Sequence, residues 1–200
     1  MDKIIDKIDE LAKTHAIHPA WGLNHCIRVK ELAMRIAEKE GMKIDLDVLY
    51  IAAILHDFGA YPAFRKENKN HSDSSAEFAE RQLKEYGLEE EKIKKIVCAI
   101  SGHMFDATPD ISSNEAVVLH DADVLDFLGA IGISRIYSII GIDDWAKDMD
   151  EAHKLLENFR VSLPSKLITK TAKEIAAIRV AEMDVFFSQL DAESDGGKHK

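Results

Sequence analysis

The sequence is poor in residues that interrupt helices, and it has no long apolar run. Its 200 residues include only four prolines and ten glycines, which leaves little material for the many turns of a β-sandwich or barrel and indicates long helices. The two cysteines, Cys26 and Cys98, form no CxxC pair, which excludes a thiolate zinc cluster and fits a reducing compartment. With no run of membrane-spanning length and no apolar signal-peptide core at the start, we expect a cytoplasmic protein without a membrane partner.

Positive charge is also scarce. Lysine and arginine together number 26 against 36 aspartates and glutamates, a net charge of −10. Such a protein should repel a nucleic-acid backbone, so no polymer of this kind is expected as a partner. A small phosphorylated ligand remains compatible if basic groups lie near its site. The sequence carries no signal for the oligomeric state, which stays unknown.

The composition supports a single helical core. A hydrophobic content of 46% in a chain of this length predicts one all-α domain over residues 1–190, with a motif-bearing core at about 20–140 and a disordered tail at 191–200. Residue periodicity, glycine stops and capping residues predict the segment boundaries. The expected helices cover residues 2–16, 20–41, 48–60, a segment capped by Ser72 or Asp73 that runs to Tyr86, 89–102 and 164–190.

One stretch organises the rest of the chain. Residues 48–60 read VLYIAAILHDFGA, a run that is apolar on every side and ends in His56 and Asp57, with Gly59 as its expected stop and Asp45 as its N-cap. Buried imidazole and carboxylate groups cost several kcal/mol unless they are paired or bound to a metal. A second apolar run, residues 116–119, again leads into polar groups, of which Asp123 is one.

Four groups lie on or at the end of apolar helices: His25, His56, Asp57 and Asp123. Two imidazoles and two carboxylates form a ligand set for a divalent metal of intermediate hardness, with positions left open for water and substrate. Such a site suits hydrolysis of a phosphate ester. The alternative for His56 and Asp57 by themselves is an ion pair at a helix end.

The spacing H…HD…D resembles the HD superfamily of metal-dependent phosphohydrolases, with His25 inside HCIRV, His56 and Asp57 inside ILHDFG, and Asp123 inside DADVLD. The tract HDADVLDFLGAIGISRI is most similar to small bacterial and archaeal HD hydrolases, some of which act on nucleoside triphosphates or monophosphates. The resemblance implies an HD-domain helical bundle in which these four residues bind Mn, Fe, Co, Ni, Mg or Zn, with one ion favoured over two. Asp121 competes as the last ligand, but the family pattern places the ligand before x-Leu, which favours Asp123.

Two further histidines, His71 and His103, lie between the HD pair and Asp123. HD proteins with two metals place additional histidines in this order, so the resemblance implies that the pair either holds a second ion or contacts the phosphate and the attacking water. Solvated surface histidines are the alternative. Asp57, His71 and His103 are the expected catalytic groups.

Basic side chains supply the expected substrate contacts. Arg28 follows His25 by three residues and is either a phosphate contact or a surface residue beside the site. Lys66 and Lys69 offer local positive charge, with Lys69 the chosen substrate contact and a solvated loop the alternative.

We therefore expect a metal-dependent phosphohydrolase that acts on a small phosphorylated substrate, a nucleotide. Two other hypotheses stay open. One is an HD-type diiron oxygenase that uses all six groups. The other is a non-catalytic, metal-binding module that senses nucleotides.

Overall fold

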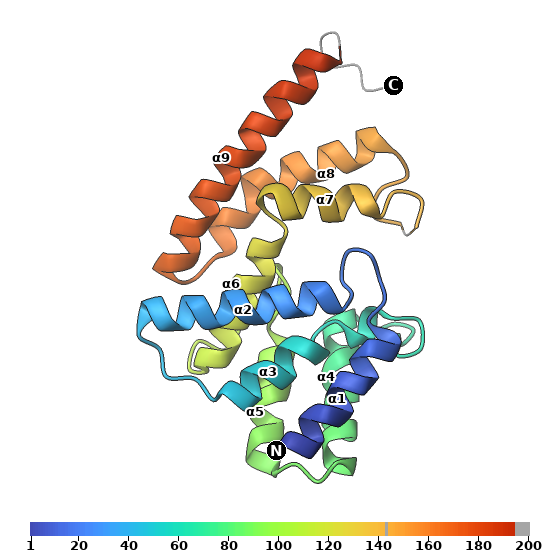
Figure 1. Ribbon diagram of the computed structural model, residues 1–200, viewed down its shortest axis with the longest axis vertical. Coiled ribbons are helices and arrows are strands. Elements are labelled where there is room, and N and C mark those ends of the chain that lie inside the picture. Colours follow the sequence, from blue (N-terminus) through green and yellow to red (C-terminus); the bar gives the residue numbers. More distant parts are fainter. Residues whose placement is uncertain (143, 195–200) are drawn as a thin grey trace.

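Helices make up the regular structure of residues 1–142 and 144–194, the part of the chain that the computed structural model describes, and no strand occurs in it (Figure 1). The all-α expectation is confirmed. The α-helices are α1 (Asp2–His15), α2 (Leu23–Glu40), α3 (Leu46–Leu55), α4 (His71–Glu85), α5 (Glu90–Ser101), α6 (Asn114–Asp126), α7 (Gly129–Ser138), α8 (Met149–Ser162) and α9 (Lys170–Glu193), and the 3₁₀ helices are η1 (Phe58–Ala60) and η2 (Leu163–Lys166).

The apolar helix α3 begins as expected but ends earlier. Asp45 caps it, because its side chain accepts hydrogen bonds from the backbone N–H groups of Asp47 and Val48. Its last residue is Leu55, so His56 and Asp57 lie in the turn before η1 rather than inside a helix. The prediction that the last turn of this helix carries His56 and Asp57 and that Gly59 stops it is therefore wrong, and the two polar side chains follow the helix end.

Gly59 has a different role from the expected stop signal. A Cβ added there would lie 2.1 Å from the backbone oxygen of His71, and its N–H donates a 2.7 Å hydrogen bond to Ser75 Oγ. The absent side chain lets η1 lie directly against the first turns of α4. This close approach brings the start of α4 next to Asp57.

Other boundaries also shift. The second helix begins at Leu23, after a turn, and not directly after Pro19. Asn70 caps α4, so this helix starts at His71, before the expected Ser72 or Asp73 cap. The last long helix starts at Lys170 with Thr169 as its cap.

The expected disordered tail, 191–200, is helical as far as Glu193. Residues 195–200 lie outside the described part of the chain, so the expectation for them stays a prediction.

Helix α3 is the centre around which the site is built. It packs against α1, α2, α5 and α6, while α4 covers η1 and α5. Helices α7, α8 and α9 form one end of the molecule in Figure 1, and α2 and α6 lie between them and the other helices. Five segments converge as a result: the first turn of α2, the ends of α3, α5 and α6, and the start of α4.

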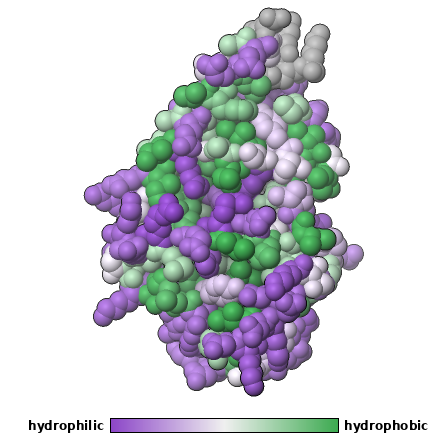
Figure 2. Space-filling model, viewed as in Figure 1, coloured by the Kyte–Doolittle hydropathy of each residue, from purple (hydrophilic) through white to green (hydrophobic). Residues whose placement is uncertain are grey.

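The surface carries a mixture of side chains. Figure 2 shows hydrophobic and hydrophilic residues interleaved over the viewed face, without one continuous apolar belt. Among the described residues, no helix combines the length and the hydropathy that crossing a bilayer requires.

Candidate metal centre and adjoining cavity

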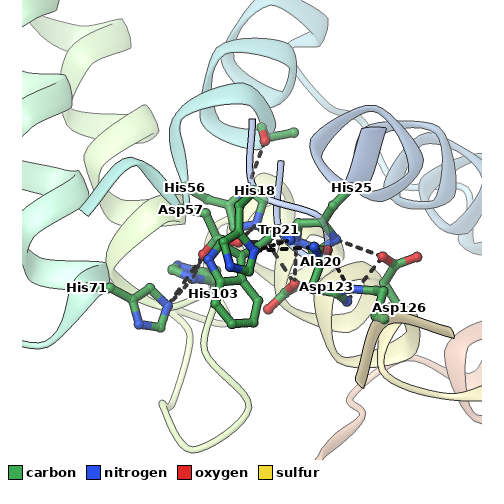
Figure 3. Close-up of polar contacts among 12 residues, drawn as sticks. His18, Ala20, Trp21, His25, His56, Asp57, His71, His103, Asp123 and Asp126 are labelled. Atoms are coloured by element: carbon green, nitrogen blue, oxygen red, sulfur yellow. Dashed lines mark hydrogen bonds and ion pairs between the residues drawn. The ribbon is translucent and has the colours of Figure 1, made fainter. Parts of the chain in front are cut away.

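The four residues of the H…HD…D pattern meet at one point (Figure 3). The Nε2 atoms of His25 and His56 are 3.1 Å apart. His25 Nε2 lies 3.3 Å from both Asp57 Oδ2 and Asp123 Oδ1. All four side chains are buried. Folding thus joins donors from α2, the end of α3 and α6 into one cluster, here called the histidine–aspartate cluster.

The imidazoles of His56, in the cluster, and of His103, next to it, are oriented as metal ligands. His56 Nδ1 lies 2.8 Å from the carbonyl oxygen of Ala53, and His103 Nδ1 lies 2.6 Å from that of Ile100. Because a carbonyl oxygen only accepts, both Nδ1 atoms donate, and the Nε2 lone pairs of the neutral rings point into the cluster. Lone pairs that face one another in a buried space fit a bound cation. The residues present therefore suit a divalent metal.

His71 and His103 lie on the other side of Asp57. Their Nε2 atoms are 3.4 and 3.6 Å from Asp57 Oδ1 and 3.3 Å from each other. Asp57 thus presents Oδ2 to the pair formed by His25 and His56, and Oδ1 to the pair formed by His71 and His103. Three groups of donors have the proximity that an ion requires: His25, His56 and Asp57; His56, His103 and Asp123; and Asp57, His71 and His103.

The charges of the cluster depend on one another. Burial and the charge of Arg135 lower the pKa of His25, but contacts with Asp123, Asp126 and Asp57 outweigh them and raise it to about 9. Burial raises the pKa of Asp57, yet His56 and the neighbouring imidazole hydrogen bonds hold it well below its usual range. The proton on His25 therefore offsets part of the charge of these carboxylates when no cation does so.

The outer histidines differ in their titration. Burial lowers the pKa of His71. For His103, burial acts in the same direction, but the hydrogen bond and charge of Asp57, with the charge of Asp123, outweigh it and raise the pKa. His71 also has a more exposed side chain, at 32% against 1% for His103. It is the member of the pair that solvent can reach.

Asp126 supports the cluster from outside, a role that the sequence did not single out. Its Oδ2 lies 2.7 Å from His25 Nδ1, and it accepts hydrogen bonds of 3.1 and 2.9 Å from Arg28 Nε and Nη2. Arg135 Nη1 approaches it at 3.1 Å. Arg28, an expected substrate contact, is therefore occupied in holding the carboxylate that orients His25. Only the spacing of Asp126, one helical turn after Asp123, could have indicated this.

Asp121 is placed away from the cluster. Its carboxylate accepts hydrogen bonds from the backbone N–H groups of Ile168 and Thr169, both at 2.8 Å, and from Thr169 Oγ1 at 2.6 Å. It thereby fixes the segment between η2 and α9. The geometry supports Asp123 as the ligand.

Lys69 also lies elsewhere. It pairs with Glu77 on the exposed side of α4, as does Lys66. The structure does not bring Lys69 to the cluster, in contrast to the sequence expectation. From the same loop, Arg65 is the basic residue that lines the adjoining cavity.

A cavity of about 200 Å³ opens beside the cluster. Asp57, His71 and Asp123 of its lining supply polar groups, and Arg65 and Arg135 supply positive charge. The remaining lining is Trp21, Ala60, Met104, Phe105, Phe127 and Trp145. Sequence reasoning missed Arg135 and the aromatic residues, because in a helical pattern such residues are typical of a core. The arrangement can hold a cation and an anionic ligand next to each other.

Fold and site together define a class: an all-α protein that gathers imidazole and carboxylate donors from several helices at one buried point beside a cavity. The model of the HD domain matches residues 22–128, more than half of the chain, and the chain belongs to this family.

Similar proteins agree with this assignment. The chain is 29% identical over 184 residues to YpgQ of Bacillus subtilis strain 168. The aligned region covers 86% of this chain and 84% of YpgQ. The crystal structure of YpgQ in complex with ADP has a TM-score of 0.70 at 26% identity, with 94% and 96% of the two chains covered. The crystal structure of a predicted HD superfamily hydrolase from an uncultured Thermotogales bacterium has a TM-score of 0.66 at 27% identity, with 96% of this chain and 92% of that chain covered. The structures similar to this chain thus include a protein described as a predicted HD superfamily hydrolase.

Proposed function

We propose that this protein is a metal-dependent phosphohydrolase acting on a small nucleotide. The observation that carries the proposal is the position of the histidine–aspartate cluster, whose Asp57 and Asp123 line a cavity that Arg65 and Arg135 also line. Cation ligands and anion-binding groups thus share one space. This combination is what a phosphate ester or anhydride requires.

His25, His56, Asp57 and Asp123 would hold the divalent cation. When bound, the cation supplies Lewis acidity to a phosphoryl oxygen and lowers the pKa of a water molecule. One ion remains the favoured number, because this set offers four side chains, whereas a second position would have His71, His103 and a shared Asp57. The half-exposed His71 makes that second position the weaker one. Metal analysis of the protein after anaerobic purification tests the count, and one equivalent or less speaks against a dinuclear form.

Side chains of the cavity would bind and orient the substrate. Arg135 and Arg65 can donate to phosphoryl oxygens, since a guanidinium presents a fork of donors that matches them. His71 lies at the cavity wall 3.4 Å from Asp57. From there it can hydrogen-bond to the phosphoryl group or to the attacking water, as expected of a catalytic residue, with His103 behind it. Asp126 keeps the His25 imidazole in its orientation.

The choice of a nucleotide has its own support. The structurally similar YpgQ was crystallised with ADP. We extend this ligand class to the present chain because its cavity adjoins both the cluster and the two arginines.

A substrate screen tests the proposal. The protein is incubated with dNTPs, NTPs, NMPs and cyclic nucleotides and with manganese or other divalent ions, and the products are identified. Asp57→Ala should abolish metal retention and turnover, because Asp57 faces both the pair His25 and His56 and the pair His71 and His103. Asp47→Ala is a matched control: it removes an aspartate from the opposite end of α3, where Asp47 pairs with Lys92, and should leave turnover unchanged. Unchanged turnover in Asp57→Ala would contradict the proposal.

The six donor residues, Asp57 among them, also favour a second candidate, a diiron oxygenase of the HD type. It predicts bound iron, a reaction that consumes oxygen, and no release of phosphate from any nucleotide. A protein that retains metal but fails in both assays is instead the non-catalytic, nucleotide-sensing module.

A further inference from the structure

Four aromatic residues line the cavity beside the histidine–aspartate cluster and form a wall. It consists of Trp21, Phe105, Phe127 and Trp145, here called the aromatic wall. The ring centroids of Trp21 and Trp145 are 5.4 Å apart, and Trp145 stacks on Phe127 at 5.9 Å with an angle of 11° between the planes. Trp21 lies in the turn before α2, Phe105 in the loop between α5 and α6, Phe127 directly after α6, and Trp145 in the segment between α7 and α8. Residues far apart in sequence thus build one continuous apolar surface.

Contacts with polar groups hold the wall in place. Trp21 stacks on His18, with ring centroids 3.9 Å apart and planes 10° apart. The guanidinium of Arg135 lies 4.3 Å from the ring centroid of Phe127, and its Nε donates a 2.7 Å hydrogen bond to the carbonyl oxygen of Ala20. Arg135 is only 5% exposed. The wall is therefore a supported surface and not a set of loose side chains.

The same arginine joins the wall to the cluster. Arg135 packs on Phe127 and also contacts Asp126, the carboxylate that holds His25. Figure 3 shows Trp21 and Ala20 next to the cluster residues. A ligand in the cavity would meet flat aromatic rings as well as positive charge and metal-ligating groups. This matches a molecule with a planar ring and a phosphoryl group.

We infer that the aromatic wall binds the base of the nucleotide, with Trp145 and Trp21 as its stacking residues. This inference rests on the proposed function and narrows it. Stacking on aromatic side chains accepts any base because each has a flat π-face. Phosphates without a base, such as sugar phosphates, would lack this contact and bind more weakly.

The chain offers a direct probe of the wall. Both of its two tryptophans belong to the wall, so tryptophan fluorescence reports on this surface alone. We would titrate the full-length protein, loaded with magnesium, with two non-hydrolysable ligands. One is adenosine 5′-(α,β-methylene)diphosphate, and the other is methylenediphosphonate, which has the same phosphonate core and no nucleoside. The first should change the emission and bind at least about tenfold more tightly.

Variants locate the effect. Trp145→Ala should reduce the advantage of the nucleoside ligand to less than threefold, and Trp145→Phe should restore part of it because a ring remains. Trp145 is 38% exposed, so its loss should leave the fold intact, which a thermal melt checks. Ile142→Ala is the matched control: this apolar residue of the same segment is 58% exposed and does not line the cavity, and the advantage should persist.

Three results would overturn the inference: equal affinity for the two ligands, equal weakening of both by Trp145→Ala, or no binding of either. Turnover measurements then distinguish a failure of this inference from a failure of the proposed function. If ribose 5-phosphate and AMP are hydrolysed with the same kcat/KM, the phosphohydrolase stands and the base-binding wall fails. If no phosphorylated compound is turned over, the proposed function fails as well.

Discussion

Two aspartates on α6 should respond in opposite ways to the same substitution. Asp121→Asn should lower the stability of the protein and leave its metal affinity intact, whereas Asp123→Asn should remove the metal. The reason is their surroundings. Asp121 accepts three hydrogen bonds from residues 168 and 169, while Asp123 Oδ1 faces the Nε2 atoms of His25 and His56 at 3.3 and 3.8 Å.

The size of the Asp121 effect follows from its buried contacts. Asparagine keeps one acceptor oxygen, but an NH₂ group replaces the other carboxylate oxygen. This new donor would face a donor of residue 168 or 169. A lost hydrogen bond to a charged group costs about 1.5–3 kcal/mol, and an unsatisfied buried N–H adds about 1–3 kcal/mol. A total near 3 kcal/mol should lower the melting temperature by roughly 6–12 °C in a chain of this size.

One assay measures both effects. Thermal unfolding is followed in chelator and again in manganese at about 100 times the dissociation constant of the wild type, which should stabilise a binding-competent protein by about 2.7 kcal/mol. Asp121→Asn should melt early in chelator and still gain this stabilisation. Asp123→Asn should gain nothing from manganese, whatever its melting temperature in chelator. An Asp121→Asn protein that melts normally but no longer responds to manganese would refute this division of roles.

The remaining predictions concern the loop and turn beside the cluster. Gly59→Ala should lower stability by about 1–3 kcal/mol and reduce turnover, because the new Cβ would collide with the backbone of His71; calorimetry and initial rates check both, and a fully active, equally stable variant would argue against the close approach. Arg65→Ala should raise KM for the phosphorylated substrate about tenfold, since Arg65 lines the cavity, whereas Lys69→Ala should not, because Lys69 pairs with Glu77; the reverse result in steady-state kinetics would restore Lys69 as the substrate contact.

Local features explain why much of the fold could be predicted. The scarcity of proline and glycine, the cap at Asp45 and the left-handed Gly41 (φ 66°) after α2 act within a few residues of where they stand. Boundaries failed where tertiary contacts decide. Gly59 belongs to a packing contact with α4, and the turn at His56 and Asp57 ends α3 before it.

The four donors of the candidate site were visible in the sequence because each lies on or at the end of an apolar helix, where an unpaired polar group would be costly. Spacing along the chain could not say which way each side chain points. Asp121 and Asp123 are two residues apart and of the same type, and only the packing of residues 168 and 169 against α6 separates their roles. The role of Arg28 is likewise set by packing, because it contacts a carboxylate 98 positions away.

The sequence by itself determined an all-helical chain with a set of histidines and aspartates suited to a divalent cation, because helix propensity and the cost of buried charge are local properties. The tertiary structure alone decided that Asp57 faces two pairs of histidines, that Asp126 supports His25, and that Trp21 and Trp145 line one cavity. These relations join residues from distant helices, and the direction of a side chain across such a contact is set by packing, which a linear pattern does not contain.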